Sequence, residues 1–474
     1  MPTFSVFRRA ALALAVLLTD TPAWAEAGAT QLDGKLLGIL WVVPFAGMLL
    51  SIAVLPLATP QLWHHHFGKI SAGWALAVLG PMVVAFGFPL ATHELLQTMM
   101  LEYVPFLILI GALFCVTGNI HLKGNRHGAP GLNTAFLATG TALASVMGTT
   151  GASMLLIRPL IRANDDRRHN AHVMVFFIFL VANIGGALTP LGDPPLFLGF
   201  LQGVSFFWTL KYLFAPTALA AIILLVLFYA IDLYLYRREE RAKPDPTPDS
   251  NVQILGGVNL LLLGAIVLAV LASGTFKPGA ISLFGLELEI QNLLRDATLI
   301  VIAAISFAIT PASTREANEF SFAPVIEVAK LFAGIFITII PAIAILRAGR
   351  DGSLASIIAL VTTPDGAPRN AMYFWLTGGL SSFLDNAPTY LIFFNAAGGD
   401  AQELMGPLAT TLMAISAGAV FMGANTYIGN APNFMVKAIA ESRGVKMPGF
   451  FGYMLWSGCV LLPVFALVTA LFFL

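Results

Sequence analysis

Apolar stretches recur along the whole chain and alternate with short polar segments. A helix needs about 20 apolar residues to cross the roughly 30 Å hydrocarbon core of a bilayer. Because helices also satisfy their own backbone groups in lipid, the pattern predicts an all-α polytopic membrane protein. The ten predicted spans cover residues 36–57, 72–90, 102–119, 172–205, 213–236, 253–273, 297–311, 325–346, 408–440 and 450–474.

Two further apolar stretches, 132–161 and 371–396, do not fit as simple spans. Basic residues lie on both sides of the first one, and such residues concentrate on the cytoplasmic side of a membrane. We therefore expect this stretch to enter and leave on the same side, as a re-entrant hairpin. Small, hydroxyl or proline residues mark both centres, at Met147–Gly151 and Ser381–Thr389, as hairpin tips require. The flanking basic residues are Lys123, Arg126, Arg158, Arg162, Arg167 and Arg168.

The two halves of the chain resemble each other when one is shifted along the other so that Thr189 falls on Thr426. Thr189–Phe197 then aligns with Thr426–Phe434, and Asp193 falls on Asn430. The same shift aligns the two hairpin tips and the last span of each half. An odd number of crossings in each half gives the copies opposite orientations in the membrane. Inverted repeats with interrupted helices are typical of secondary transporters, whose site lies at the midplane between the halves.

This repeat defines the predicted organisation of the chain. We expect a signal peptide at 1–25, a first inverted repeat at 26–236, a cytoplasmic linker at 237–252 and a second inverted repeat at 253–474. The first repeat contains the hairpin 132–161 and a broken helix at 172–205, and the second contains the hairpin 371–396 and a broken helix at 408–440.

The N-terminus has the features of a secretory signal peptide. Arg8 and Arg9 precede the apolar segment Ala10–Leu18, and Ala23–Ala25 supplies a small-x-small cleavage site. We expect cleavage after Ala25 and insertion into a bacterial inner membrane. An uncleaved anchor helix is the alternative.

Composition narrows the function classes. Hydrophobic residues make up 58% and charged residues 11% of the 474 residues, where a soluble domain carries about a quarter charged. A soluble enzyme is therefore nearly excluded, and we expect a transporter in contact with the lipid bilayer. The net charge of +0 gives no attraction to nucleic acid. Neither a His-Glu-x-x-His nor a Gly-x-Ser-x-Gly motif supports a membrane hydrolase.

Asp193 and Asp385 are the strongest functional candidates. An intramembrane charge costs about 3 kcal/mol or more, so it indicates function by default. Each aspartate lies in an interrupted segment, and no Lys or Arg lies in either hairpin tip or unwound motif. Two neighbouring carboxylates repel each other, which favours a state where a proton or Na⁺ neutralises one of them. Helix capping is the structural alternative for both residues.

Amide and hydroxyl groups around the interruptions offer further oxygen ligands, although each can also serve as a contact between helices. Glu102 and Glu327 begin apolar runs and are candidates for a proton relay, with an interfacial position as the alternative. The further candidate contacts are Thr149, Thr150, Asn183, Thr189, Ser382, Asn386, Thr389, Asn425, Thr426, Asn430 and Asn433.

The segments Ser381–Thr389 (SSFLDNAPT) and Asn183–Asp193 (NIGGALTPLGD) resemble the ion transporter superfamily, especially NhaD-type sodium/proton antiporters and the related citrate transporters of the CitMHS type. The resemblance covers most of residues 36–474. It implies two re-entrant hairpins, two broken helices, a homodimer and elevator-like movement. Carried over by position, it implies cation ligands at Thr149, Asn183, Asp193, Asp385, Asn386, Asn425 and Asn430.

The leading hypothesis is a sodium/proton antiporter that carries Na⁺ and H⁺ at Asp193 and Asp385 and needs no cofactor. Citrate or metal–citrate symport is the alternative, because a metal bound to citrate could use the two aspartates. Dicarboxylate transporters of the superfamily carry Ser-Asn-Thr at both hairpin tips. This chain instead has Met147–Thr149 and Leu384–Asn386 there, which weakens a dicarboxylate assignment. A channel, which conducts without alternating access, is the alternative from a different class.

Overall fold

The computed structural model describes residues 31–239, 247 and 249–474. The predicted signal peptide and residues 240–246 and 248 of the predicted linker lie outside the described residues. Eight helices of the described part are long and apolar enough to cross a membrane, and a bent pair can supply a ninth span. These observations confirm the predicted all-α polytopic fold.

The ten predicted spans correspond to the eight long helices, the bent pair and one shorter apolar helix, Ala409–Asn425. The bent pair consists of α14 (Ala323–Thr338) and α15 (Ile340–Arg347), which meet at 42°. The second predicted span starts too late in the sequence, because its helix already begins at Pro60. His64–His66 lower the hydropathy at the start of this helix, but histidine does not break helices.

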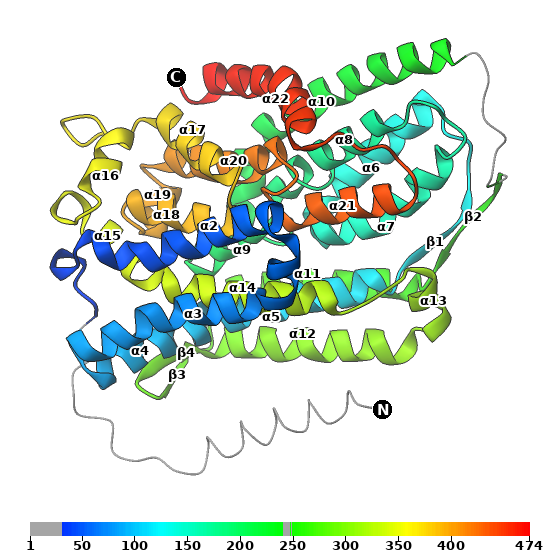
Figure 1. Ribbon diagram of the computed structural model, residues 1–474. Helices are drawn as coiled ribbons and strands as arrows, with labels where there is room; N and C mark the ends of the chain where they lie inside the picture. The colour runs from blue at the N-terminus through cyan, green and yellow to red at the C-terminus, as the bar shows by residue number, and fades with distance from the viewer. Residues whose placement is uncertain (1–30, 240–246, 248) are drawn as a thin grey trace.

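The helices form two groups that pack mainly among themselves, in the lower and upper parts of Figure 1. We call them the first and the second helix group. The first group comprises α2 (Val43–Ala58), α3 (Pro60–Phe86), α4 (Phe88–Thr98), α5 (Val104–Gly118), α11 (Val258–Thr275), α12 (Ile290–Ile309) and α14. The second group comprises α6 (Pro130–Met147), α7 (Thr149–Ala163), α8 (Ala171–Leu180), α9 (Pro194–Leu201), α10 (Phe206–Arg238), α17 (Asn370–Ser381), α18 (Asn386–Ala396), α20 (Ala409–Met422), α21 (Ala431–Ser442) and α22 (Phe450–Phe472).

Short elements connect these helices. A π-helical turn, η3 (Met99–Tyr103), joins α4 to α5. Strand β1 (His121–Asn125) pairs antiparallel with β2 (Ser250–Leu255), and β3 (Ala280–Leu283) forms a hairpin with β4 (Leu286–Glu289). The remaining short helices are η1 (Gly34–Leu36), η2 (Ile39–Val42), η4 (Ile184–Leu188), α13 (Ala312–Ala317), η5 (Gly349–Asp351), α16 (Ala355–Val361), α19 (Ala401–Met405) and η6 (Gly423–Asn425).

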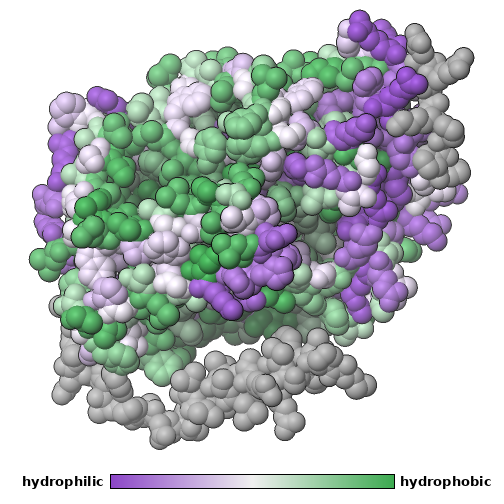
Figure 2. Space-filling model, in the orientation of Figure 1, coloured by the Kyte–Doolittle hydropathy of each residue, from purple (hydrophilic) through white to green (hydrophobic). Residues whose placement is uncertain are grey.

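The distribution of apolar side chains fits a bilayer. Helix α8 is apolar on all sides and lies in the interior of the second helix group, as expected for a helix without a polar face. Outer helices instead expose large apolar side chains, among them Val84, Leu261 and Phe451. Figure 2 shows hydrophobic side chains over much of one face and hydrophilic ones gathered toward the end that carries β1 and β2.

The structure repeats its elements at the spacing found in the sequence. Helices α7 and α18 begin at Thr149 and Asn386, and helices α9 and α21 begin at Pro194 and Ala431. The separation is the same in both pairs and equals the shift that aligns the two halves of the sequence. The second helix group is therefore built largely from two copies of one arrangement of helices.

Candidate functional site

Four interrupted helical segments meet in the second helix group. The first hairpin, α6–α7, breaks at Gly148, whose φ of +79° lies in the left-handed region that favours glycine. The second hairpin, α17–α18, breaks over Ser382–Asp385. One broken helix has its unwound part at Thr189–Asp193, before α9, and the other at Thr426–Asn430, before α21.

The carboxylate of Asp193 lies where these four segments meet. The residue is 1% exposed. Thr149 Oγ1 and Asn430 Nδ2 donate hydrogen bonds to Asp193 Oδ1 at 3.1 and 3.3 Å. Asn386 Nδ2 donates to Asp193 Oδ2. Asp193 and its three donors thus come one each from the four interrupted segments.

The N-termini of four helices also meet here. Helices α7, α9, α18 and α21 all begin within one residue of Asp193 or one of its three donors. A helix N-terminus carries a partial positive charge, so these ends stabilise a buried carboxylate. Among the described residues, no Lys or Arg side chain forms an ion pair with Asp193. When Asp193 is ionised, its charge is opposed only by dipoles, and a cation would be strongly attracted.

Three buried amide oxygens in the same segments lack a hydrogen-bond partner within the described part of the chain. They are the Oδ1 atoms of Asn183, Asn386 and Asn425. An unpartnered buried acceptor costs about 1–3 kcal/mol, and a bound cation would remove this penalty. Amide and carboxylate oxygens are suitable ligands for a hard cation such as Na⁺.

Asn183 and Asn433 join the two broken helices directly. Asn183 Nδ2 donates to Asn433 Oδ1 at 2.7 Å and to the carbonyl of Ile178 at 2.8 Å. Asn433 Nδ2 donates in turn to the carbonyls of Gly423 and Thr426, at 2.8 and 3.0 Å. These bonds satisfy backbone groups that the helix breaks leave free, and they fix the unwound segments around Asp193.

Bonds between a hairpin and a broken helix also match in the two halves. Thr189 Oγ1 donates to the carbonyl of Ser145, and Thr426 Oγ1 donates to the carbonyl of Ser382 at 2.5 Å. The two donors, and likewise the two acceptors, are related by the shift that aligns the sequence halves. Ser382 Oγ also accepts a bond from Asn425 Nδ2 at 2.9 Å. These bonds hold the hairpin tips against the broken helices.

Asp385 differs from Asp193 in its surroundings. Its Oδ1 accepts a bond from the backbone nitrogen of Ala387 at 3.0 Å, so that it caps α18. Asp193, by contrast, makes no capping bond to α9. The capping alternative therefore fits Asp385 and not Asp193. Asp385 directly precedes Asn386, which donates to the Asp193 carboxylate. A cation shared by both aspartates stays a prediction.

The other predicted residues make no hydrogen bond to Asp193 within the described part of the chain. Thr389 Oγ1 donates to the carbonyl of Asp385 at 2.9 Å, and Thr150 follows Thr149 on α7 without contacting the carboxylate. Glu102 in η3 accepts a bond from Gln202 Nε2 at 3.0 Å, at the far end of α9. Glu327 is exposed on α14. The proton-relay role of both glutamates stays a prediction.

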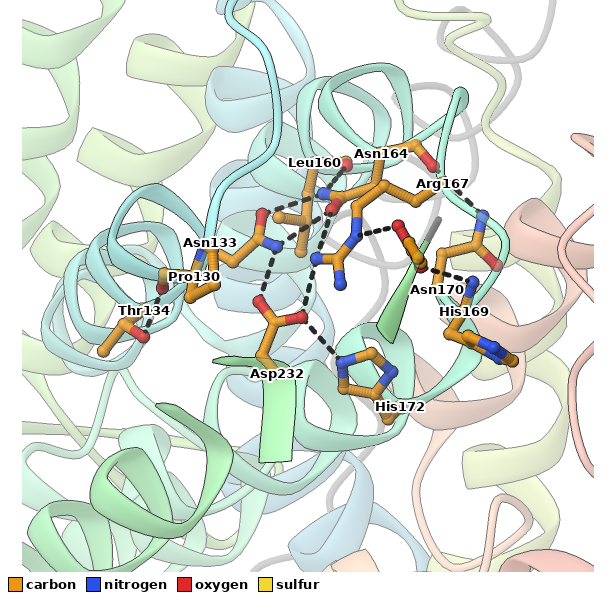
Figure 3. Close-up of polar contacts among 11 residues, drawn as sticks. Pro130, Asn133, Thr134, Leu160, Asn164, Arg167, His169, Asn170, His172 and Asp232 are labelled. Carbon is orange, nitrogen blue, oxygen red and sulfur yellow. Dashed lines mark hydrogen bonds and ion pairs between the residues drawn. The ribbon is translucent and has the colours of Figure 1, made fainter. Parts of the chain in front are cut away.

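A second buried polar cluster was not predicted. Figure 3 shows Asn133, Arg167 and His172 around Asp232. Arg167 Nη1 and His172 Nε2 lie 2.6 and 2.9 Å from Asp232 Oδ1, and Asn133 Nδ2 donates to Asp232 Oδ2 at 2.9 Å. Arg167 Nε also lies 3.5 Å from Glu239 Oε2. In the sequence, only Asp232 within the apolar run of α10 indicates this cluster. The cluster joins α10 to the base of the first hairpin.

Clusters of metal-binding side chains are absent from the described ranges. No group of three or more His, Cys, Asp or Glu residues there is arranged to hold a metal ion. His64–His66 follow one another on α3 and belong to no such group. A cation at the candidate site would therefore depend on the Asp193 carboxylate and on neutral oxygens.

Comparison with known protein families shows which family the chain belongs to. The sequence model of a family described as "Putative citrate transport" matches residues 34–473. The chain belongs to this citrate transport family. The match confirms the resemblance to citrate transporters and covers both hairpins and both broken helices. A search of curated proteins gave no match. The chain is thus a multi-pass membrane protein of a transporter family, and its relation to NhaD-type antiporters stays a prediction.

Proposed function

We propose that this chain is a sodium/proton antiporter of the bacterial inner membrane, in which Asp193 binds Na⁺ and H⁺ in turn. One observation carries the proposal. A buried carboxylate is contacted by side chains from all four interrupted segments, and no cationic side chain pairs with it among the described residues. An intramembrane carboxylate in this setting indicates a transport site.

Competition for the same oxygens couples the two ions. A proton on Asp193 removes the charge that attracts Na⁺, and bound Na⁺ prevents protonation of the carboxylate. The unpartnered oxygens of Asn183 and Asn386 give Na⁺ neutral ligands that a proton does not need. Exchange then requires only that the empty, charged site cannot cross the membrane, because an unpaired charge there is costly.

Movement of the second helix group against the first would expose the site to each side in turn. The two groups pack mainly among themselves, which supports such relative movement. We expect a homodimer, in which the first helix groups form the static part.

Everted membrane vesicles test the antiport proposal. Addition of Na⁺ should dissipate an imposed pH gradient in vesicles that contain the wild-type chain. Vesicles without the chain provide the control. Absence of any Na⁺-dependent pH change would reject antiport.

Citrate transport is the second candidate, favoured by the family match. The four helix N-termini around Asp193 suit a substrate carboxylate once a proton or Na⁺ neutralises the aspartate. Proteoliposomes supplied with Na⁺ alone, citrate alone or both separate the candidates. Labelled citrate uptake that depends on a Na⁺ or proton gradient would establish symport. Sodium/proton exchange without citrate would establish antiport.

A further inference from the structure

Arginines near the ends of α7 and α21 share too few negative partners. Arg158 Nη2 lies 3.3 Å from Glu319 Oε2, and Arg443 Nη2 lies 2.5 Å from Glu319 Oε1. A single carboxylate therefore serves two guanidinium groups. Glu319 belongs to the connection between α13 and α14, whereas both arginines belong to the second helix group.

Arg158 is incompletely satisfied although it is buried. Its side chain is only 10% exposed. Its Nε and Nη1 atoms are buried and have no hydrogen-bond partner within residues 31–239, 247 and 249–474. Buried polar groups in native proteins are normally paired, so these atoms can accept a further partner such as water, an ion or a ligand.

A third arginine increases the imbalance of charge. Arg162 lies one turn after Arg158 on α7, and its Nη2 donates to the carbonyls of Leu122 and Gly124, at 2.8 and 3.4 Å. Asp165 follows Arg162 by three residues, and its Oδ2 accepts a bond from Thr247 Oγ1 at 2.7 Å. Even with Asp165 included, three positive charges face two negative ones, which leaves +1 (3 − 2).

Neighbouring charges do not correct this imbalance. Lys437 pairs with Glu441 on the same helix, at 2.6 Å. Arg167 offers a comparison of charge within the same chain, because this buried arginine lies beside two carboxylates, Asp232 and Glu239, although its Nε and Nη2 atoms also lack a hydrogen-bond partner among the described residues. The arginine cluster formed by Arg158, Arg162 and Arg443 lacks the equivalent of that second carboxylate.

The surroundings of the arginine cluster are those of a membrane surface. The basic residues place this end of the molecule on the predicted cytoplasmic side. Phe320 follows Glu319 in the chain and packs on Phe322, and Phe322 packs on Phe307. Phe322 and Phe307 are each 42% exposed. An apolar surface beside the arginine cluster can accommodate an acyl chain.

We propose that the arginine cluster binds the phosphate group of an anionic phospholipid from the cytoplasmic leaflet. Guanidinium groups bind phosphate oxygens through paired hydrogen bonds, and basic pockets between membrane helices bind lipid headgroups. The phosphate supplies the missing negative charge, and the unpartnered N–H groups of Arg158 gain acceptors. Because Glu319 already occupies two of the guanidinium groups, it competes with the phosphate. This site is independent of the transported substrate.

Native mass spectrometry of the full chain in detergent tests the proposal with phosphatidylglycerol as the probe. Arg443→Gln should lower the fraction with bound lipid about tenfold, because one charge-assisted contact is lost. Arg158→Gln should have the same effect. If Arg158→Gln does not fold, Arg443→Gln still tests the proposal, because the Arg443 side chain is half-exposed. Lys437→Gln, which removes one positive charge from α21 outside the arginine cluster, should bind like the wild type. Equal lipid retention in all variants would overturn the proposal.

Glu319→Gln gives a test in the opposite direction. Loss of the competing carboxylate should increase phosphatidylglycerol retention, and unchanged or lower retention would contradict the proposal. Thermal unfolding of the wild type distinguishes the sources of phosphate. Phosphatidylglycerol should raise the unfolding temperature, whereas phosphatidylcholine and inorganic phosphate should not. Stabilisation by inorganic phosphate alone would overturn the assignment to a lipid.

Discussion

Asp193 is held by neutral donors, so that each donor can be removed without changing the charge of the site. Thr149 is the most useful of them, because its backbone nitrogen independently donates to the carbonyl of Gly192 at 2.9 Å. Loss of the hydroxyl therefore leaves the hairpin tip attached to the unwound segment. The effect on transport then reports on the contact between Thr149 and Asp193.

Thr149→Val should raise the Na⁺ concentration needed for half-maximal transport by about tenfold or more, because a hydrogen bond to the ionised carboxylate contributes about 1.5–3 kcal/mol to the form that binds Na⁺. The Na⁺ dependence of exchange in proteoliposomes measures this change. Thr150→Val is the matched control, since Thr150 is adjacent and does not contact Asp193. Equal effects of the two substitutions would contradict the assigned contact.

Substitutions at Asp385 separate helix capping from ion binding. Asparagine caps a helix as well as aspartate, whereas alanine does not. Asp385→Asn should therefore abolish Na⁺-dependent exchange without loss of stability. Asp385→Ala should also abolish exchange and lower the free energy of unfolding by about 1 kcal/mol. Wild-type exchange by Asp385→Asn would show that Asp385 acts as a cap alone.

The sequence predicts the residues of the site better than it predicts the contacts between them. It predicted Asp193, Thr149, Asn386 and Asn430 as ligands, and the structure brings all four together. It did not predict that Asn386, rather than its neighbour Asp385, bonds Asp193. Asp385 caps α18 and Asn386 is its first helical residue, so only the packing of the hairpin decides which of them faces the site.

At the scale of elements, the break in the first hairpin depends on one backbone conformation. Gly148 has a φ of +79°, which allows α6 to end and α7 to begin beside Asp193. A β-carbon disfavours this conformation. The hairpin tip is therefore the part of the site where backbone strain should be easiest to introduce.

Gly148→Ala should lower the free energy of unfolding by about 1–2 kcal/mol and reduce exchange. Thermal unfolding and exchange in proteoliposomes measure the two effects. Gly131→Ala in α6 is the control, because a β-carbon there would meet no atom within 4 Å and its φ is not positive. The control should retain stability and exchange. The same result for both variants would show that the tip does not need glycine.

The sequence predicted elements with strong local signals. Long apolar runs gave the spans, and Gly, Pro and hydroxyl residues marked the interruptions. The start of α3 at Pro60 was missed because His64–His66 interrupt the apolar run without breaking the helix. Pairing of β1 with β2 was missed as well, since it joins residues 121–125 to 250–255 across most of the first repeat. Such pairing leaves no local pattern in the sequence.

For the molecule as a whole, the ion pair between Arg167 and Asp232 connects the base of the first hairpin with α10. Hydropathy does not reveal such a pair, because Asp232 stands alone in an apolar run, Arg167 lies in a charged connection, and no local pattern joins the two. Asp232→Ala should lower the free energy of unfolding by about 3–5 kcal/mol, since it leaves Arg167 buried without its closest partner. Chemical denaturation measures this loss. Asp351→Ala, which breaks an exposed pair with Lys35, should have little effect. Equal losses would contradict the structural role of Asp232.

Uptake of radioactive Na⁺ into proteoliposomes with an acidic interior tests the role of Asp193 most directly. The wild-type chain should accumulate Na⁺ as protons leave. Asp193→Asn preserves the size of the side chain and matches Asn430 of the other repeat. Na⁺ uptake by this variant should remain at the background of empty liposomes. Accumulation by Asp193→Asn at the wild-type rate would show that this carboxylate does not carry the exchanged ions.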